Sequence, residues 1–159
     1  VFHFRAALRE LFTDTDMELF FYCGELLSAL SQTNTTNLSF NCHSICRAIS
    51  TILPRLSVVT GGLVGYTPDP KESGTLRIKI SSHSWLTTPD GAIIDPNPVG
   101  CIACSPLMFP AMKTGSAYTA FGSQAYNPTY KRHGFRKTKK VRSEIEALIN
   151  FWQPRVSAT

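Results

Sequence analysis

The stretch from Asn41 to Tyr66 constrains the fold more than any other part of the chain, because it joins an amphipathic helix to a strand. Asn41 is a favourable N-cap residue, since its side chain can accept a backbone N–H that the first helical turn leaves unpaired. Pro54 predicts that the helix ends or bends nearby, and residues 57–66 are expected to form the strand. Apolar side chains recur at helical spacing, which predicts that one face of the helix packs into a core. These residues are Ile45, Ile49, Ile52, Leu53 and Leu56.

Cys42 opens this helix and is the first candidate for chemistry. The positive end of a helix and its free N–H groups favour a thiolate, which is the nucleophilic form of cysteine. The alternative is that Cys42 is one more small buried apolar residue, as most helical cysteines are. A second part of the chain favours the chemical interpretation.

That second part is a predicted hairpin that carries a histidine and a carboxylate. Residues 75–82 alternate apolar and polar side chains and lead into His83, which predicts a strand. After a turn at Pro89-Asp90-Gly91, residues 92–95 form a second short apolar strand that ends at Asp95. Antiparallel neighbours of this kind can bring an imidazole and a carboxylate within hydrogen-bonding reach.

The ordered set of motifs resembles the transglutaminase-like cysteine enzymes, a branch of the papain-like group. It comprises a cysteine opening a helix, Gly65-Tyr66 ending a strand, His83-Ser84-Trp85, and Asp95-Pro96 on the adjacent strand. The resemblance covers residues 41–98 and implies an α+β fold in which the nucleophile helix packs on a small antiparallel sheet. It implies a catalytic triad of Cys42, His83 and Asp95 that acts on a peptide or protein amide and needs no cofactor.

The chemistry of such a site explains the residue types. Cys42 would attack a carbonyl carbon and form a thioester, while His83 would transfer protons and Asp95 would orient the imidazole. The backbone N–H of Cys42 can supply one oxyanion donor. The family's second donor is usually a side chain upstream of the cysteine, and the sequence does not choose among Gln32, Asn34, Asn37 and Asn41.

Trp85 has two interpretations of equal weight. It either packs over the site and excludes water, or it is an ordinary core aromatic residue. Hydrolysis of the thioester by water is preferred over transfer to an amine, but the sequence does not separate a peptidase from a deamidase or a transglutaminase.

Composition and length predict one globular domain over residues 1–159. Hydrophobic residues make up 43% and charged residues 17% of the chain, which argues against disorder. No apolar run approaches the roughly 18 residues of a membrane span. Five cysteines without a disulfide-scaffold spacing favour a reducing, cytoplasmic compartment or a catalytic thiol.

The flanks are predicted to be mainly helical. We expect a short helix over residues 1–12, a second from a cap at Asp14 or Thr15 to Ser31, and a last helix over residues 143–152 that starts with a capping box of Ser143 and Glu146. Gly61-Gly62 predicts a bulge or a close approach by another segment. Residues 106–130 either cover the cleft or complete the sheet.

The remaining cysteines and histidines lack a convincing pattern. Cys101 and Cys104 form a CxxC pair, but no second ligand pair accompanies it, so incidental cysteines are preferred over a zinc or redox site. Cys23 and Cys46 are interpreted as core residues, and His43 as a surface or rim residue.

Positive charge is concentrated in residues 131–142. This basic segment holds seven of the 16 basic residues and no acidic one: Lys131, Arg132, Arg136, Lys137, Lys139, Lys140 and Arg142. It could bind nucleic acid, an acidic protein or an anionic membrane surface, but a solvated connection to the last helix is the preferred interpretation. Two alternatives to an enzyme therefore remain: a catalytically inactive binding module of the same fold, and a binder of anionic surfaces.

Overall fold

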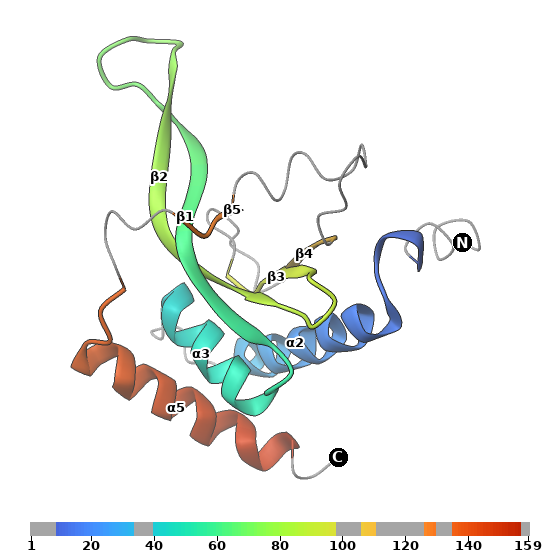
Figure 1. The fold of residues 1–159 in the computed structure, drawn as a ribbon. Coiled ribbons are helices and arrows are strands. Elements are labelled where there is room, and N and C mark those ends of the chain that lie inside the picture. Colours follow the sequence, from blue (N-terminus) through green and yellow to red (C-terminus); the bar gives the residue numbers. More distant parts are fainter. Residues whose placement is uncertain (1–8, 34–39, 98–105, 111–125, 130–134, 157–159) are drawn as a thin grey trace.

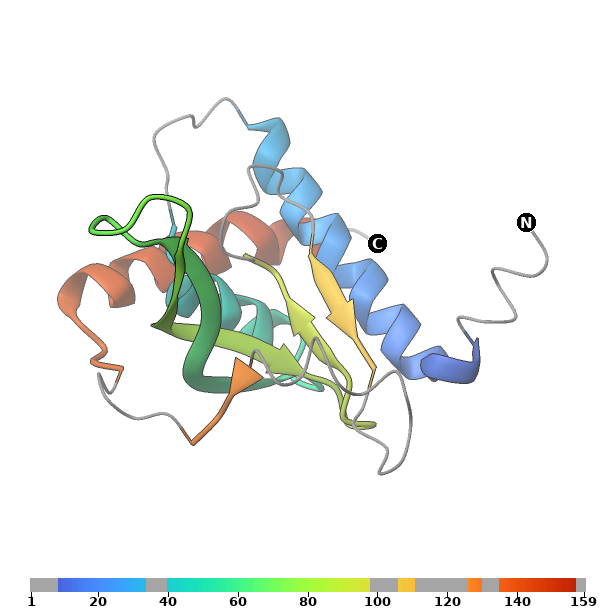
Figure 2. The same cartoon turned by 90° about the horizontal axis from the view of Figure 1, so that it is seen from above.

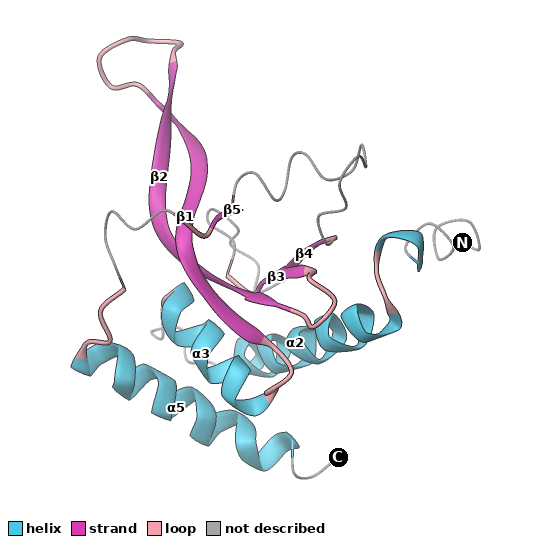
Figure 3. Cartoon of the chain, viewed as in Figure 1, coloured by secondary structure: helices cyan, strands magenta, loops and turns pink. Residues whose placement is uncertain are grey.

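The computed structural model describes residues 9–33, 40–97, 106–110, 126–129 and 135–156. The elements follow the order α2 (Asp14–Gln32), α3 (Cys42–Ile52), β1 (Ser57–Pro68), β2 (Leu76–Thr87), β3 (Ile93–Asp95), β4 (Leu107–Phe109), β5 (Tyr126–Asn127) and α5 (Lys139–Val156) (Figure 1). Three helices and an antiparallel sheet share these residues (Figure 3), which confirms the predicted α+β class.

Local capping explains where the helices begin. The side chain of Asn41 accepts a hydrogen bond from the backbone N–H of Ser44 at 2.9 Å, so α3 starts at Cys42 as the sequence predicted. The cap of α2 is Thr13 rather than Asp14 or Thr15, because Thr13 and Asp16 satisfy each other's backbone N–H groups in a capping box.

The last helix differs more from its prediction. It begins at Lys139, four residues before the predicted start, so the capping box of Ser143 and Glu146 is wrong. The hydroxyl of Thr138 accepts a hydrogen bond from the backbone N–H of Val141 at 3.2 Å and caps the start of the helix instead. Of the predicted first helix, residues 9–11 are helical and residues 1–8 lie outside the described part.

The sheet has the strand order β4-β3-β2-β1-β5, with antiparallel neighbours. β1 and β2 pair without a break from Ser57↔Thr87 to Pro68↔Leu76, so there is no bulge at Gly61-Gly62. The far end of this hairpin extends beyond the helices as an arm (Figure 1). Leu76 and Ile78 are 67% and 64% exposed there. The alternating pattern therefore predicted the strand correctly, but its apolar residues at this end are not buried.

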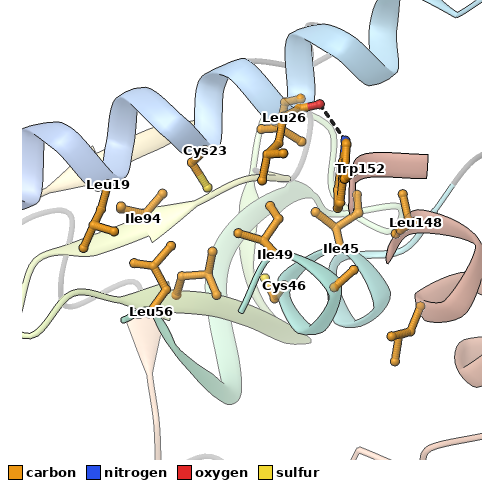
Figure 4. Close-up of a cluster of buried hydrophobic side chains, with 14 of the residues drawn as sticks. Leu19, Cys23, Leu26, Ile45, Cys46, Ile49, Leu56, Ile94, Leu148 and Trp152 are labelled. Atoms are coloured by element: carbon orange, nitrogen blue, oxygen red, sulfur yellow. Dashed lines mark hydrogen bonds between the residues drawn. The ribbon is translucent and has the colours of Figure 1, made fainter. Parts of the chain in front are cut away.

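All three helices lie on one side of the sheet (Figure 2). Leu86 of β2 and Ile94 of β3 lie opposite each other in the sheet and belong to the main core, in which Figure 4 shows Ile94 together with side chains of the helices. Trp152 of α5 closes this core, and its indole N–H donates to the carbonyl of Leu26 at 2.9 Å. None of the helices in the described part is long and apolar enough to cross a membrane.

Candidate active site

A buried histidine and a buried aspartate meet where β2 and β3 separate. The two strands pair at Leu86↔Ile94 and Thr87↔Ile93. Beyond these pairs, the side chains of His83 on β2 and Asp95 on β3 connect the two strands. His83 Nε2 lies 2.7 Å from Asp95 Oδ2, and the side chains are 2% and 0% exposed. The structure therefore brings together the two residues that the hairpin pattern predicted to be neighbours.

Asp95 is held by two further donors. The hydroxyl of Tyr126 donates to Oδ2 at 2.6 Å, and the backbone N–H of Asn97 donates to Oδ1 at 3.0 Å. Both carboxylate oxygens thus accept hydrogen bonds, which fixes the orientation of the group and compensates for its burial. Sequence analysis missed Tyr126, because β5 is two residues long and lies 31 residues after Asp95.

The environment of His83 favours the charged imidazolium. Burial alone lowers the pKa of His83, but the hydrogen bond with Asp95, a hydrogen bond with Cys42 and the charges of both groups outweigh it and raise the pKa to about 9. Since Nε2 faces Asp95, Nδ1 is the ring nitrogen available to Cys42. The imidazole is therefore oriented by the carboxylate on one side and available to a thiol on the other.

Cys42 is the first residue of α3 and is partly exposed, whereas the helix is buried from Ser44 to Cys46. Its backbone N–H belongs to the first helical turn, whose N–H groups have no carbonyl partners within the helix. Cys46, one turn later, donates from Sγ to the carbonyl of Ser84 at 3.2 Å and so anchors this end of α3 against β2. The nucleophile position therefore combines access to solvent with a fixed backbone.

The other two cysteines of the described residues lack that access. Cys23 and Cys46 are both fully buried, as predicted. Burial raises the pKa of the Cys23 thiol to about 12 and also raises that of Cys46, to which the charges of Asp95 and Cys42 add. Both thiols are therefore protonated and inert at neutral pH.

An aromatic group encloses the histidine on the side of the sheet away from the main core. The rings of His83 and Trp85 stack with centroids 6.4 Å apart, and Trp85 meets Tyr126 edge-on at 5.1 Å. Phe109 of β4 adds a ring 5.4 Å from that of Tyr126. Trp85 is 2% exposed and packs on the site rather than in the main core, which favours the first of its two interpretations.

Gly61 permits this enclosure. It lies opposite His83 in the β1–β2 register, and a Cβ at this position would come within 2.3 Å of the carbonyl oxygen of Asn127 and 2.9 Å of Trp85. A side chain here would therefore push away the strand that carries Tyr126. The prediction of a close approach at this glycine pair is confirmed.

Two of the four candidates for a second oxyanion donor lie in the described residues, and both already make hydrogen bonds within their own helices or caps. Asn41 uses its Oδ1 to cap α3 and also accepts from the hydroxyl of Ser44 at 3.1 Å, so only its Nδ2 could donate. Gln32 ends α2, where its amide N lies 3.5 Å from the hydroxyl of Ser28. Asn34 and Asn37 lie outside the described residues, and the choice among the four remains open.

A second polar cluster, which sequence analysis missed, lies next to Cys42 on α3. His43 Nδ1 is 2.7 Å from the hydroxyl of Ser84, so the histidine predicted to lie at the rim has a partner in the sheet. Arg47 donates to the same hydroxyl at 3.3 Å. Burial lowers the pKa of His43, with smaller contributions from the charges of Arg47 and His83. The i, i+4 spacing of His43 and Arg47 was the available signal.

Other predicted features lie partly or wholly outside the described part. Cys101, Cys104, Lys131 and Arg132 lie outside the residues that the structure describes. The other five basic side chains of the segment 131–142 are exposed. Binding of an anionic partner there stays a prediction. Within the described ranges, no three His, Cys, Asp or Glu side chains are arranged to hold a metal ion.

Comparisons of the chain with protein-family models, curated proteins and solved structures find no match.

Proposed function

We propose that the protein is a cysteine-dependent amide hydrolase or acyltransferase of the transglutaminase-like type, with Cys42 as nucleophile. The observation that carries the proposal is the buried pair of His83 and Asp95 at 2.7 Å, with its imidazole turned toward a partly exposed cysteine at a helix N-terminus. Perturbed titratable groups held in this way are typical of catalytic sites. The order of Cys, His and Asp along the chain, which resembles that family, adds to this argument.

The geometry suits two-step acyl transfer. The Cys42 thiolate attacks the carbonyl carbon of an amide, and the oxyanion is stabilised by the backbone N–H of Cys42. The C–N bond then breaks, the proton on His83 passes to the departing nitrogen, and a thioester remains on Cys42. Neutral His83 next takes a proton from water or an amine, which attacks the thioester and releases the thiolate.

The enclosure of His83 has a defined part in this scheme. Tyr126 and Asn97 hold the carboxylate of Asp95, and the carboxylate in turn fixes the ring of His83. Trp85 and Tyr126 shield the pair from water, which strengthens its electrostatic interaction with the imidazolium. Proton transfer is thereby directed to the ring nitrogen that faces Cys42.

The first test is the rate at which iodoacetamide alkylates Cys42, followed at pH 7 by mass spectrometry of the Cys42 peptide. Because an imidazolium next to the sulfur stabilises the thiolate, we expect the His83→Ala variant to react at least about tenfold more slowly than the parent. The buried Cys46 serves as an internal control for folding, since it becomes reactive only if the core opens. Equal rates in parent and variant, with Cys46 protected, would contradict the proposal.

A second test separates the enzyme from a catalytically inactive binding module. Incubation with p-nitrophenyl acetate should leave an acetyl thioester at position 42 of the parent and no thioester at this position in the Cys42→Ser variant. The decay of the thioester in water, compared with its decay in the presence of a primary amine, distinguishes a hydrolase from an acyltransferase. A parent that never forms the thioester would identify a binding module.

A further inference from the structure

Arg47 is a partly buried cation that is held rigidly beside the candidate nucleophile. One Nη donates to the carbonyl of His43 at 3.1 Å and to the hydroxyl of Ser84 at 3.3 Å, and the other donates to the hydroxyl of Thr60 at 3.1 Å. The ring of Phe135 covers the guanidinium, with Cζ 3.6 Å from the ring centroid. The side chain is therefore fixed between α3, the sheet and the segment that leads into α5.

The charge of Arg47 has no counter-ion in the described part of the chain. The ion pairs found there join Arg55 to Glu18, His83 to Asp95 and Lys140 to Glu144, and none involves Arg47. All three hydrogen-bond acceptors of the guanidinium are neutral oxygens. Since charges taken out of water are normally paired, a fixed and uncompensated guanidinium is suited to receive an anion.

The guanidinium contacts the residue that directly follows Cys42, through the carbonyl of His43. Its bond to the carbonyl of His43 holds it beside the first turns of α3, at the end of the helix that begins with Cys42. Burial lowers the pKa of Arg47, and negative charge at Cys46 and Cys42 would act in the opposite direction; since the Cys46 thiol stays protonated at neutral pH, Cys42 is the position whose thiolate would interact with the cation. The helix N-terminus adds positive potential at the same place.

The guanidinium of Arg47 has N–H donors that make no hydrogen bond to the described residues. A guanidinium carries five N–H donors in a planar fork, and three hydrogen bonds are made to the residues that the structure describes. Two donors therefore remain for a ligand, enough to bind a carboxylate. The neighbouring His43 has its Nδ1 occupied by Ser84, which leaves Nε2 as a further polar contact.

From these contacts we infer that Arg47 forms a carboxylate-binding subsite beside Cys42, so that the acyl substrate carries an anionic group near the reacting carbonyl. This inference rests on the proposed function. The substrate class is then an acidic acyl compound, such as a peptide with a carboxylate close to the amide bond that reacts. Arg47 positions this group and thereby selects acidic over neutral substrates.

The test compares two reagents that differ in charge, iodoacetate and iodoacetamide, at Cys42. Each rate is normalised to the rate of the same reagent with glutathione, which removes the difference in intrinsic reactivity. We expect iodoacetate to be favoured about tenfold in the parent, with saturation at high reagent concentration and competition by acetate. The preference should be lost in Arg47→Met and kept in Arg55→Met, which removes an equal charge at the other end of α3.

An acetate titration, followed through the Nε–H signal of Arg47 by NMR, gives a second readout that needs neither a variant nor a reactive thiol. A saturable shift of that signal is expected. Equal normalised rates for the two reagents, or an iodoacetate preference that survives in folded Arg47→Met, would overturn the inference. If Cys42 is inert to both reagents the proposed function fails, and the acetate titration still decides whether Arg47 binds a carboxylate; no shift there would overturn the subsite.

Discussion

The pH dependence of stability provides a direct test of the His83–Asp95 pair. His83 has an ordinary pKa of 6.5 when unfolded and about 9 in the folded protein, so the folded state binds its proton more tightly. The resulting stabilisation is fully present below pH 6.5 and is lost as the pH rises through 9. At 1.36 kcal/mol for each pH unit between the two values, the contribution amounts to about 3 kcal/mol.

We therefore expect the free energy of unfolding to fall by about 3 kcal/mol between pH 6 and pH 9, through His83 alone. Urea unfolding of the parent and of His83→Gln, under reducing conditions, measures the two curves. Only their difference is interpreted, because His43, Cys23 and Cys46 also titrate. Folding favours neutral His43, whose contribution is lost as the pH falls below 6.5, and it favours the protonated thiols, whose contribution is lost above pH 9.

The difference between the two curves should shrink steadily from pH 6 to pH 9. A difference that stays constant within about 0.5 kcal/mol would show that the imidazole is not held as the charged partner of Asp95. In that case the general-acid role of His83 would lose its physical basis. A difference that grows with pH would have the wrong sign and would refute the assignment as well.

Two further predictions concern the shell around the pair. Tyr126→Phe removes the 2.6 Å hydrogen bond to Asp95, so we expect a loss of about 1–3 kcal/mol in urea unfolding and slower alkylation of Cys42; unchanged values of both would contradict a role in holding the carboxylate. Gly61→Ala places a methyl group 2.3 Å from the carbonyl oxygen of Asn127, so it should cost about 1–3 kcal/mol, whereas Gly65→Ala, whose Cβ would meet its nearest neighbour at 4.0 Å, serves as the matched control. Equal stability of the two glycine variants would mean that β5 does not depend on Gly61.

Local patterns were enough to predict the two halves of the candidate site. Asn41 caps α3 through its own side chain, so the position of Cys42 at the helix N-terminus follows from neighbouring residues. His83 and Asp95 lie at the ends of two strands joined by a short turn, and such strands pair with one another in a nearly fixed way. These features depend on contacts between residues that are close in sequence, which is why periodicity and turn residues revealed them.

Features that depend on distant segments were not predictable in the same way. Tyr126 reaches Asp95 because β5 pairs with β1 across Gly62↔Asn127, a contact that no local pattern specifies. Arg47 meets Ser84 and Thr60 because α3 packs across two strands.

The sequence alone thus determined which residues form the helix, the hairpin and the candidate triad, since hydrogen bonding and side-chain spacing act over a few residues. Only the tertiary structure decided what surrounds them: the hydrogen bond from Tyr126 to Asp95, the aromatic enclosure of His83 and the neutral oxygens that hold Arg47. These depend on how the sheet and the helices pack, because burial and the pairing of charges are properties of the assembled core.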